Sequence, residues 1–268
     1  VGEQYAGDVA LIFKPTRTLL SQKTKYQQVD IVETTTYGKI LFLDHLLMKT
    51  DRDGYIINEM IVHVPMMTGN PKRNVLVVGG GEGFTATQLL AYEELGKIDV
   101  IDIDFEFFEI AKKFYPKTTA SFNNPKVSLH QIDGLEFMKN THTKYDVIFV
   151  TSTHPALFTD QFYQLCQDKL VEDGIFMTDA YMPFYKLGDI DYVYMFKKLS
   201  QYFKTTKLYT CTVPSFPGGL FAFVIGSKKF DPEKDFRPIS SKISTKYYNA
   251  GLHSGCFKLP QFMTDAIK

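Results

Sequence analysis

The stretch VLVVGGGEGF, residues 75–84, decides the expected fold of this chain. Its apolar half predicts a strand buried on both faces, and the glycines after it predict a tight turn into a helix at 84–91. Glycines at such a turn let backbone N–H groups approach a ligand closely. Asp102 follows about 20 residues later, the spacing at which an acidic side chain binds the hydroxyls of a ribose. The stretch therefore predicts a nucleoside-binding α/β domain.

Further apolar runs continue this pattern along the chain. They alternate with helical stretches, which predicts a mostly parallel sheet with helices on both faces. Two runs near the C-terminus, 208–213 and 220–227, predict a closing β-hairpin. The strands expected in the parallel part of the sheet are 74–78, 99–103, 127–131, 146–150 and 174–178.

The N-terminal part has a different pattern. From Val9 to about Lys49, apolar or β-branched residues alternate with polar ones, which predicts a small antiparallel β domain. A helix is expected at 54–67, because apolar residues recur there at helical spacing and the stop signal TGNP follows at 68–71. We therefore divide the chain into an N-terminal β domain, residues 1–66, and a nucleoside-binding domain, residues 67–268.

The composition limits the possible partners. Lys+Arg and Asp+Glu number 30 each, so no overall charge favours nucleic acid or a membrane surface. The cysteines lie far apart and the histidines show no ligand spacing, so neither a disulfide nor a metal site is expected. No apolar run approaches the length of a membrane span, and the first residues lack the pattern of a signal peptide. We expect a cytoplasmic protein that binds small molecules and no metal.

Two acidic residues refine the expected ligand. Glu82 would repel a pyrophosphate, whereas it would favour a nucleoside that carries a positive sulfonium and an ammonium group. The alternative is that Glu82 only stabilises the N-terminus of the following helix. Asp133, which precedes Gly134 after the third expected strand, would accept a hydrogen bond from an adenine amino group, although an Asp-Gly pair commonly forms a turn.

Many short motifs of one family occur in this chain, in one order. They are TKYQ at 24–27, GKILFLD at 38–44, NEMIVHVP at 58–65, VLVVGGGEG at 75–83, IDID at 101–104, DVIFVTSTHP at 146–155, FTDQFY at 158–163, and the segments 213–228 and 246–260. In these motifs the chain resembles the spermidine synthase (polyamine aminopropyltransferase) family. The resemblance implies a Rossmann-like methyltransferase fold preceded by a small β domain, and a homodimer. It also implies S-adenosylmethionine or its decarboxylated form as the group donor.

The resemblance carries the family's nucleoside-binding positions onto this chain. Glu82 and Asp102 each exchange one acid for the other relative to the family. The set expected to bind the donor is Gln27, Gly79, Gly80, Gly81, Glu82, Gly83, Asp102, Ile103, Asp133, Gly134 and Thr151.

The departures from the family lie where its amine chemistry takes place. Thr151 replaces the aspartate that receives the proton of the attacking amine, and threonine is no general base near neutral pH without an activator. His154 replaces a second aspartate. The stretch DGYIINE at 53–59 lacks a glutamate, a tyrosine and a histidine of the family, and a glutamine near Met48 is absent.

The loss of these groups favours a different donor. A polyamine needs fixed carboxylates to offset the removal of water from its ammonium groups. Loss of the aspartate also lifts a repulsion against the carboxylate of intact S-adenosylmethionine. We therefore expect a methyltransferase acting on an amine or other small nucleophile, ahead of a divergent aminopropyltransferase that uses the decarboxylated donor. A third interpretation is a non-catalytic relative that binds the nucleoside, because a binding site alone does not establish chemistry.

Three polar residues at strand ends are the catalytic candidates. His154 is favoured as a base because histidine exchanges protons near neutral pH, although a histidine beside a proline in a loop is commonly a solvated surface group. Asp179 would bind a substrate ammonium or cap a loop. Thr151, at the position of the missing aspartate, completes the set.

Overall fold

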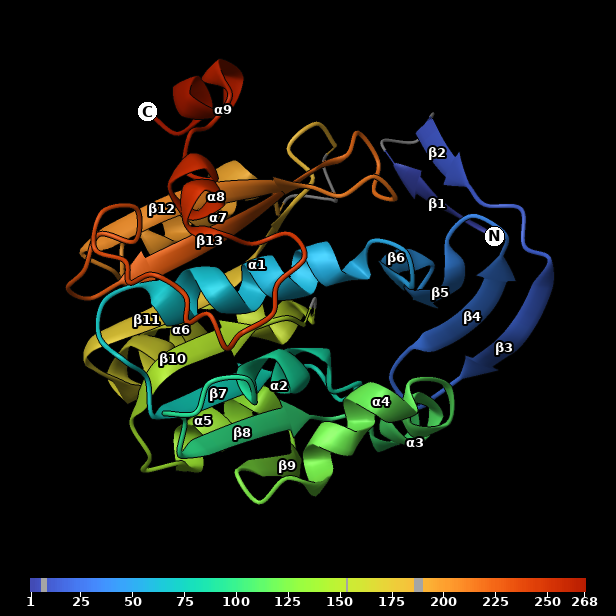
Figure 1. The fold of residues 1–268 in the computed structure, drawn as a ribbon, viewed down its shortest axis with the longest axis horizontal. Coiled ribbons are helices and arrows are strands. Elements are labelled where there is room, and N and C mark those ends of the chain that lie inside the picture. The colour runs from blue at the N-terminus through green and yellow to red at the C-terminus, as the bar shows by residue number, and fades with distance from the viewer. Residues whose placement is uncertain (6–8, 153, 186–189) are drawn as a thin grey trace.

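The computed structural model describes residues 1–5, 9–152, 154–185 and 190–268. A large sheet covered by helices forms the main body, and a small β domain stands beside it (Figure 1). This confirms the expected α/β fold preceded by a small antiparallel domain.

The large sheet has seven strands in the order β12-β13-β11-β10-β7-β8-β9. The five strands from β11 to β9 pair in parallel, and the hairpin of β12 and β13 at the other edge pairs antiparallel with β11. Parallel pairing places the carboxyl ends of the strands at one edge, where open α/β sheets bind ligands. The strands are β7 (Asn74–Val78), β8 (Lys97–Asp102), β9 (Val127–Gln131), β10 (Tyr145–Val150), β11 (Leu170–Tyr181), β12 (Thr205–Thr212) and β13 (Leu220–Ser227).

Helices cover both faces of this sheet. One apolar cluster packs α1 and α2 on the first face, and a second packs α5, α6 and α7 on the other. The helices are α1 (Gly54–Met67), α2 (Phe84–Leu89), α3 (Phe105–Phe114), α4 (Pro116–Thr119), α5 (Gly134–Asn140), α6 (Asp160–Lys169), α7 (Tyr192–Leu199), α8 (Ala250–Gly255) and α9 (Gln261–Ala266), with 3-10 turns η1 (Ala120–Asn123) and η2 (Pro155–Phe158).

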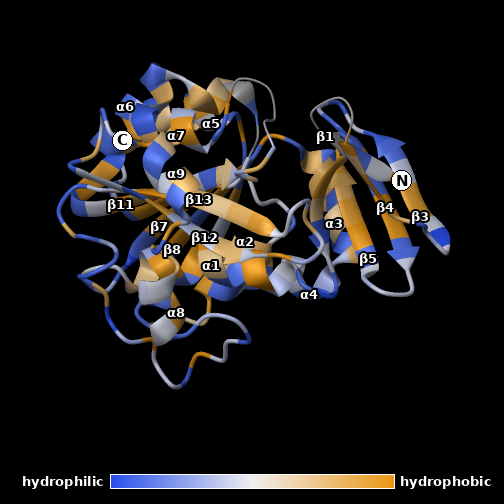
Figure 2. Cartoon of the chain, turned by 90° about the horizontal axis from the view of Figure 1, so that it is seen from above, coloured by the Kyte–Doolittle hydropathy of each residue, from blue (hydrophilic) through white to orange (hydrophobic). Residues whose placement is uncertain are grey.

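The small domain contains a four-stranded antiparallel sheet and a hairpin. One face of the sheet packs Val29, Ile31 and Leu41 against Phe107 and Ile110 of α3, and Figure 2 shows this helix beside the apolar strands. The small domain is therefore held against the nucleoside-binding part by apolar contacts. Its strands are β1 (Gly2–Tyr5), β2 (Val9–Ile12), β3 (Arg17–Lys23), β4 (Gln28–Thr34), β5 (Gly38–Leu43) and β6 (Leu46–Thr50).

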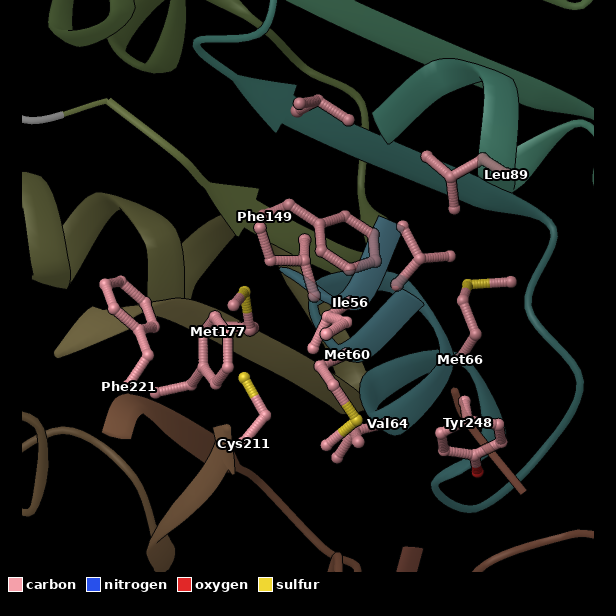
Figure 3. Close-up of a cluster of buried hydrophobic side chains, with 14 of the residues drawn as sticks. Ile56, Met60, Val64, Met66, Leu89, Phe149, Met177, Cys211, Phe221 and Tyr248 are labelled. Atoms are coloured by element: carbon pink, nitrogen blue, oxygen red, sulfur yellow. The ribbon is translucent and has the colours of Figure 1, made fainter. Parts of the chain in front are cut away.

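Helix α1 connects the two parts. Most of its residues are buried, as expected for a helix that is apolar on nearly every side. Ile56, Met60 and Val64 lie among side chains of the large sheet, including Phe149 and Met177 (Figure 3). The division at residues 66 and 67 stays a prediction. Within the described residues, no helix is long and apolar enough to cross a membrane.

Candidate active site

A cavity opens at the carboxyl ends of the parallel strands, beside the small β domain. It is lined by residues from β6, α1, the glycine loop and the ends of β7, β8, β10 and β11. The predicted site residues that line it are Gln27, Gly79, Gly80, Glu82, Asp102, Ile103, Asp133, Gly134, Thr151, His154 and Asp179. Gly81 and Gly83, which the structure also describes, fall outside this lining. The structure thus gathers most of the predicted set around one space.

The glycine loop is held against Asp102. Gly80 has φ of +102°, a conformation that a residue with a side chain rarely adopts. The N–H of Gly81 donates to Oδ2 of Asp102 at 2.8 Å, and a β-carbon on Gly81 would lie 2.9 Å from that oxygen. Glycine is therefore needed at position 81 for close approach to the carboxylate, although Gly81 itself does not face the cavity.

Asp102 is fixed by backbone donors on both oxygens. Its Oδ1 accepts from the N–H of Asp104 at 2.9 Å, in addition to the bond from Gly81. Burial raises the pKa of Asp102, while these two N–H donors oppose that rise. Each oxygen keeps a further lone pair, so the carboxylate can accept from the hydroxyls of a ribose.

Asp104 was not predicted, and it joins the two domains at the cavity. Its Oδ2 accepts from Oγ1 of Thr24 at 2.6 Å and from Nε2 of Gln27 at 2.8 Å. Its Oδ1 caps α3 by accepting from the N–H of Phe107 at 3.0 Å. The only signal for it in the sequence was the second aspartate of the IDID motif at 101–104.

Asp133 is the N-cap residue of α5 and lines the cavity. Its Oδ1 accepts from the N–H of Glu136 at 2.9 Å, so it does cap a helix as well as line the cavity. The other carboxylate oxygen leaves room for a second donor. A dual use of this kind fits both interpretations of the Asp-Gly pair.

Glu82 and Lys49 both line the cavity, and their opposite charges act on each other without a direct contact. Burial raises the pKa of Glu82 to about 7 and lowers the pKa of Lys49 to about 7. The charge of each partner opposes the effect of burial on the other. The Lys49 ammonium lies 2.8 Å from the centroid of the Phe84 ring. Lys49 was not predicted, because it matches no motif.

Thr151 and Asp179 present unpaired oxygens. Within the described part of the chain, Oγ1 of Thr151 and Oδ1 of Asp179 are buried without a hydrogen-bond partner, and both residues line the cavity. Burial raises the pKa of Asp179 to about 7. The pairing of β11 with β13 shifts register between Asp179 and Tyr181, and Tyr181 has φ of +61°. Such bulges commonly re-aim side chains beside active sites.

His154 is placed less well for catalysis. It is exposed, and its Nδ1 accepts from the N–H of Ala156 at 3.3 Å at the start of η2. A neutral ring that accepts at Nδ1 carries its proton on Nε2, so the free nitrogen cannot accept another. This geometry fits a solvated surface histidine better than a catalytic base.

Two acids at positions shared with the family have structural partners instead. Asp53 accepts from the N–H and the hydroxyl of Ser215 at 2.8 and 2.9 Å, and Glu59 accepts from three backbone N–H groups at 246–248. Their oxygens are therefore engaged within the protein. No group of three His, Cys, Asp or Glu side chains among the described residues has the arrangement of a metal site.

Comparison with known proteins identifies the family. The spermine/spermidine synthase domain matches residues 54–238, and the spermidine synthase tetramerisation domain matches residues 3–51. The chain belongs to the spermidine synthase family. A polyamine aminopropyltransferase of Clostridium botulinum (strain Eklund 17B / Type B) is 38% identical over 273 residues, which cover 99% of this chain and 96% of that relative. One of Alkaliphilus oremlandii (strain OhILAs) is 36% identical over 275 residues, with the same coverage.

Solved structures of the spermidine synthase family agree in fold. The crystal structure of a spermidine synthase in complex with the transition state analogue AdoDATO has a TM-score of 0.93 and 32% identity, covering 99% of this chain and 94% of that one. Spermidine synthase from Thermotoga maritima has a TM-score of 0.93 and 33% identity, with 99% and 93% coverage.

The preference for methyl transfer is wrong. The curated relatives in the spermidine synthase family are named polyamine aminopropyltransferases, and no comparison supports a methyltransferase or the intact donor. That preference rested on the missing aspartate at Thr151 and on the other family carboxylates that this chain lacks. It failed physically because these losses do not empty the cavity of acids, since Asp179 adds a buried carboxylate to the same lining.

Proposed function

We propose that this chain transfers an aminopropyl group from decarboxylated S-adenosylmethionine to an amine acceptor. The observation that carries the proposal is the unpaired carboxylate oxygen of Asp179, buried in the same cavity as the acids expected to bind the nucleoside. The names of the relatives and the bound analogue AdoDATO in a structural neighbour support the same reaction.

The charges of the cavity suit this donor. Decarboxylated S-adenosylmethionine carries a sulfonium and an ammonium group and no carboxylate. Asp102 would accept from its ribose hydroxyls, Asp133 would accept from its adenine amino group, and Glu82 would face its ammonium group. Binding of that ammonium favours the ionised form of Glu82 and so opposes the effect of burial on its pKa.

The transfer requires a nucleophilic nitrogen and a proton acceptor. The lone pair of the acceptor nitrogen attacks the aminopropyl carbon bonded to sulfur, and a C–N bond forms as the C–S bond breaks. The electron pair of the broken bond stays on sulfur, which leaves in neutral 5′-methylthioadenosine. The nitrogen loses one proton, and Asp179 receives it. A carboxyl with a pKa near 7 suits this role better than an ordinary aspartate, because the best catalytic base has a pKa near the working pH.

Thr151 serves as a positioning group in this proposal. Its unpaired Oγ1 can accept a hydrogen bond from the acceptor nitrogen and so hold the lone pair toward the donor. The hydroxyl takes no proton.

The experiment incubates the purified chain with decarboxylated S-adenosylmethionine and an amine panel, and quantifies 5′-methylthioadenosine by mass spectrometry. We expect one 5′-methylthioadenosine for each aminopropylated amine. Asp179→Asn should slow turnover by about 100-fold or more while the donor still binds. Donor binding by calorimetry with no product from any amine would contradict the proposal and support a non-catalytic relative.

We further propose that the chain assembles as a homodimer or a larger oligomer through its N-terminal domain. The match of residues 3–51 to a tetramerisation domain supports an oligomer, and Ile12 in this segment is 72% exposed in the single chain. Light scattering of the purified protein distinguishes a dimer from a tetramer, and a monomer would contradict the proposal.

A further inference from the structure

Lys49 enters the cavity over a glycine. The side chain starts on β6 and passes α1, where a β-carbon on Gly54 would lie 2.5 Å from Cγ and 2.8 Å from Cε of Lys49. Any larger residue at position 54 would displace this side chain from its path. Gly54 thus leaves room for a positively charged side chain beside α1.

No carboxylate in the described part of the chain contacts the ammonium of Lys49 directly. In the described part of the chain it forms no hydrogen bond or ion pair, and its contact is with the face of Phe84, 2.8 Å from the ring centroid. Glu82 and Asp51 act on it only at longer range. A partly buried cation without a paired anion is costly to retain unless a ligand supplies the anion.

The cavity also offers the opposite charge on another element. Asp179 lies on β11 of the large sheet, whereas Lys49 lies on β6 of the small domain, and both line the cavity. Helix α1 also contributes three uncharged residues to the lining, Ile57, Asn58 and Ile61. This face of α1 therefore offers no carboxylate to a second ammonium group of a diamine, and the acids Glu3 and Asp44 line the cavity from other segments.

We propose that the acceptor is an amino acid with a side-chain amine, whose carboxylate binds Lys49 while that amine is held at Asp179. This inference rests on the proposed aminopropyl transfer and names its acceptor class. The bonds made and broken are those of that transfer, with the side-chain nitrogen of the amino acid as the nucleophile. The carboxylate of the acceptor takes no part in the bond changes and contributes affinity and orientation.

Matched acceptors that differ by one carboxylate test the proposal. Ornithine is compared with 1,4-diaminobutane, and lysine with 1,5-diaminopentane, using 5′-methylthioadenosine release with the decarboxylated donor. We expect kcat/KM to favour the amino acid of each pair by about tenfold or more, as for a charge-assisted contact. In Lys49→Met this ratio should fall at least about tenfold, because the aliphatic stem remains and the charge is lost.

Lys246→Met is the matched control. Its ammonium also lies over a ring, 5.4 Å from the centroid of Tyr55, but Lys246 does not line the cavity. This variant should keep the wild-type ratio. A wild-type preference for the diamines that Lys49→Met leaves unchanged would overturn the inference while the proposed transfer stands.

If no acceptor yields product, the proposed transfer fails. The carboxylate site at Lys49 is then tested by acceptor binding alone. Ornithine and 1,4-diaminobutane are then titrated by calorimetry into protein saturated with 5′-methylthioadenosine. Tighter binding of ornithine that is lost in Lys49→Met supports the carboxylate site. Equal or weaker binding of ornithine overturns it.

Discussion

The side-chain amide of Gln27 donates a 2.8 Å hydrogen bond to Oδ2 of Asp104, and so joins the small β domain to the residues that directly follow Asp102 at the end of β8. Thr24 donates to the same oxygen at 2.6 Å. Both donors come from the short turn between β3 and β4, and Gln27 lines the cavity. The orientation of Gln27 toward a ligand therefore depends on a carboxylate that itself serves as a helix cap.

Asp104→Ala should weaken donor binding and the fold together. It removes the cap of α3 and the acceptor for Thr24 and Gln27, which we expect to lower the free energy of unfolding by about 1–3 kcal/mol. Asp104→Asn separates the two roles, because asparagine also caps helices but presents an amide N–H2 to one side. Calorimetry should show weaker donor binding in both variants. Urea unfolding should show a larger loss of stability in the alanine variant than in the asparagine variant. Unchanged binding in both would exclude this role for Asp104.

Asp179 should show the trade-off between stability and activity that a buried catalytic acid implies. The pKa of Asp179 is raised to about 7 in the folded chain. Its favourable contribution to the free energy of unfolding is therefore complete at a pH below the ordinary pKa of aspartate, and it is lost as the pH rises through about 7. At pH 8 the folded chain must hold an ionised, unpaired carboxylate. We expect Asp179→Asn to be more stable than the wild type at pH 8, by about 1–3 kcal/mol, with the difference shrinking toward pH 4. Urea unfolding at both pH values measures this.

The pH dependence of turnover provides an independent check on Asp179. A base must be deprotonated to act, so kcat should rise with pH through about 7 in the wild type. The residual activity of Asp179→Asn should lack this rise. The same rise in the variant would assign it to another group.

The sequence predicted the elements that depend on local pattern. The run at 127–131 became β9 with the same bounds, and the helix expected at 54–67 is α1, because periodicity and stop signals act over a few residues. The roles of Asp104 and Lys49 could not be read this way. The Gln27–Asp104 bond joins residues 77 positions apart, and the path of Lys49 depends on the space left by Gly54. The register shift beside Asp179 also has no hydropathy signal.

Gly81→Ala should weaken donor binding through Asp102. The new β-carbon would lie 2.9 Å from Oδ2 and 3.1 Å from Cγ of Asp102, so the carboxylate must rotate and lose its bond from the N–H of residue 81. We expect about tenfold weaker donor binding, which corresponds to one hydrogen bond. Gly96→Ala is the control, because its β-carbon would meet nothing closer than 3.6 Å. Equal donor affinity in both variants would contradict the packing argument.

Glu59→Gln should destabilise the fold without affecting the donor site. Glu59 is 3% exposed, and it accepts from the N–H groups of Lys246, Tyr247 and Tyr248 at 2.8–2.9 Å, which fastens the C-terminal segment to α1. Glutamine replaces one acceptor oxygen by an N–H2 group, so at least one buried donor loses its partner. The expected loss is about 1–3 kcal/mol in urea unfolding.

Glu33→Gln is the matched control for this loss. Glu33 pairs with Arg17 at 3.2 Å, but their side chains are 43% and 68% exposed, and exposed ion pairs contribute about 0–1 kcal/mol. Glu59 does not line the cavity, so donor affinity should match the wild type in both variants. Equal stability losses at Glu59 and Glu33 would mean that the three backbone bonds contribute no more than a surface pair. A selective loss at Glu59 would instead show that its carboxylate stabilises the fold by holding the backbone N–H groups at 246–248.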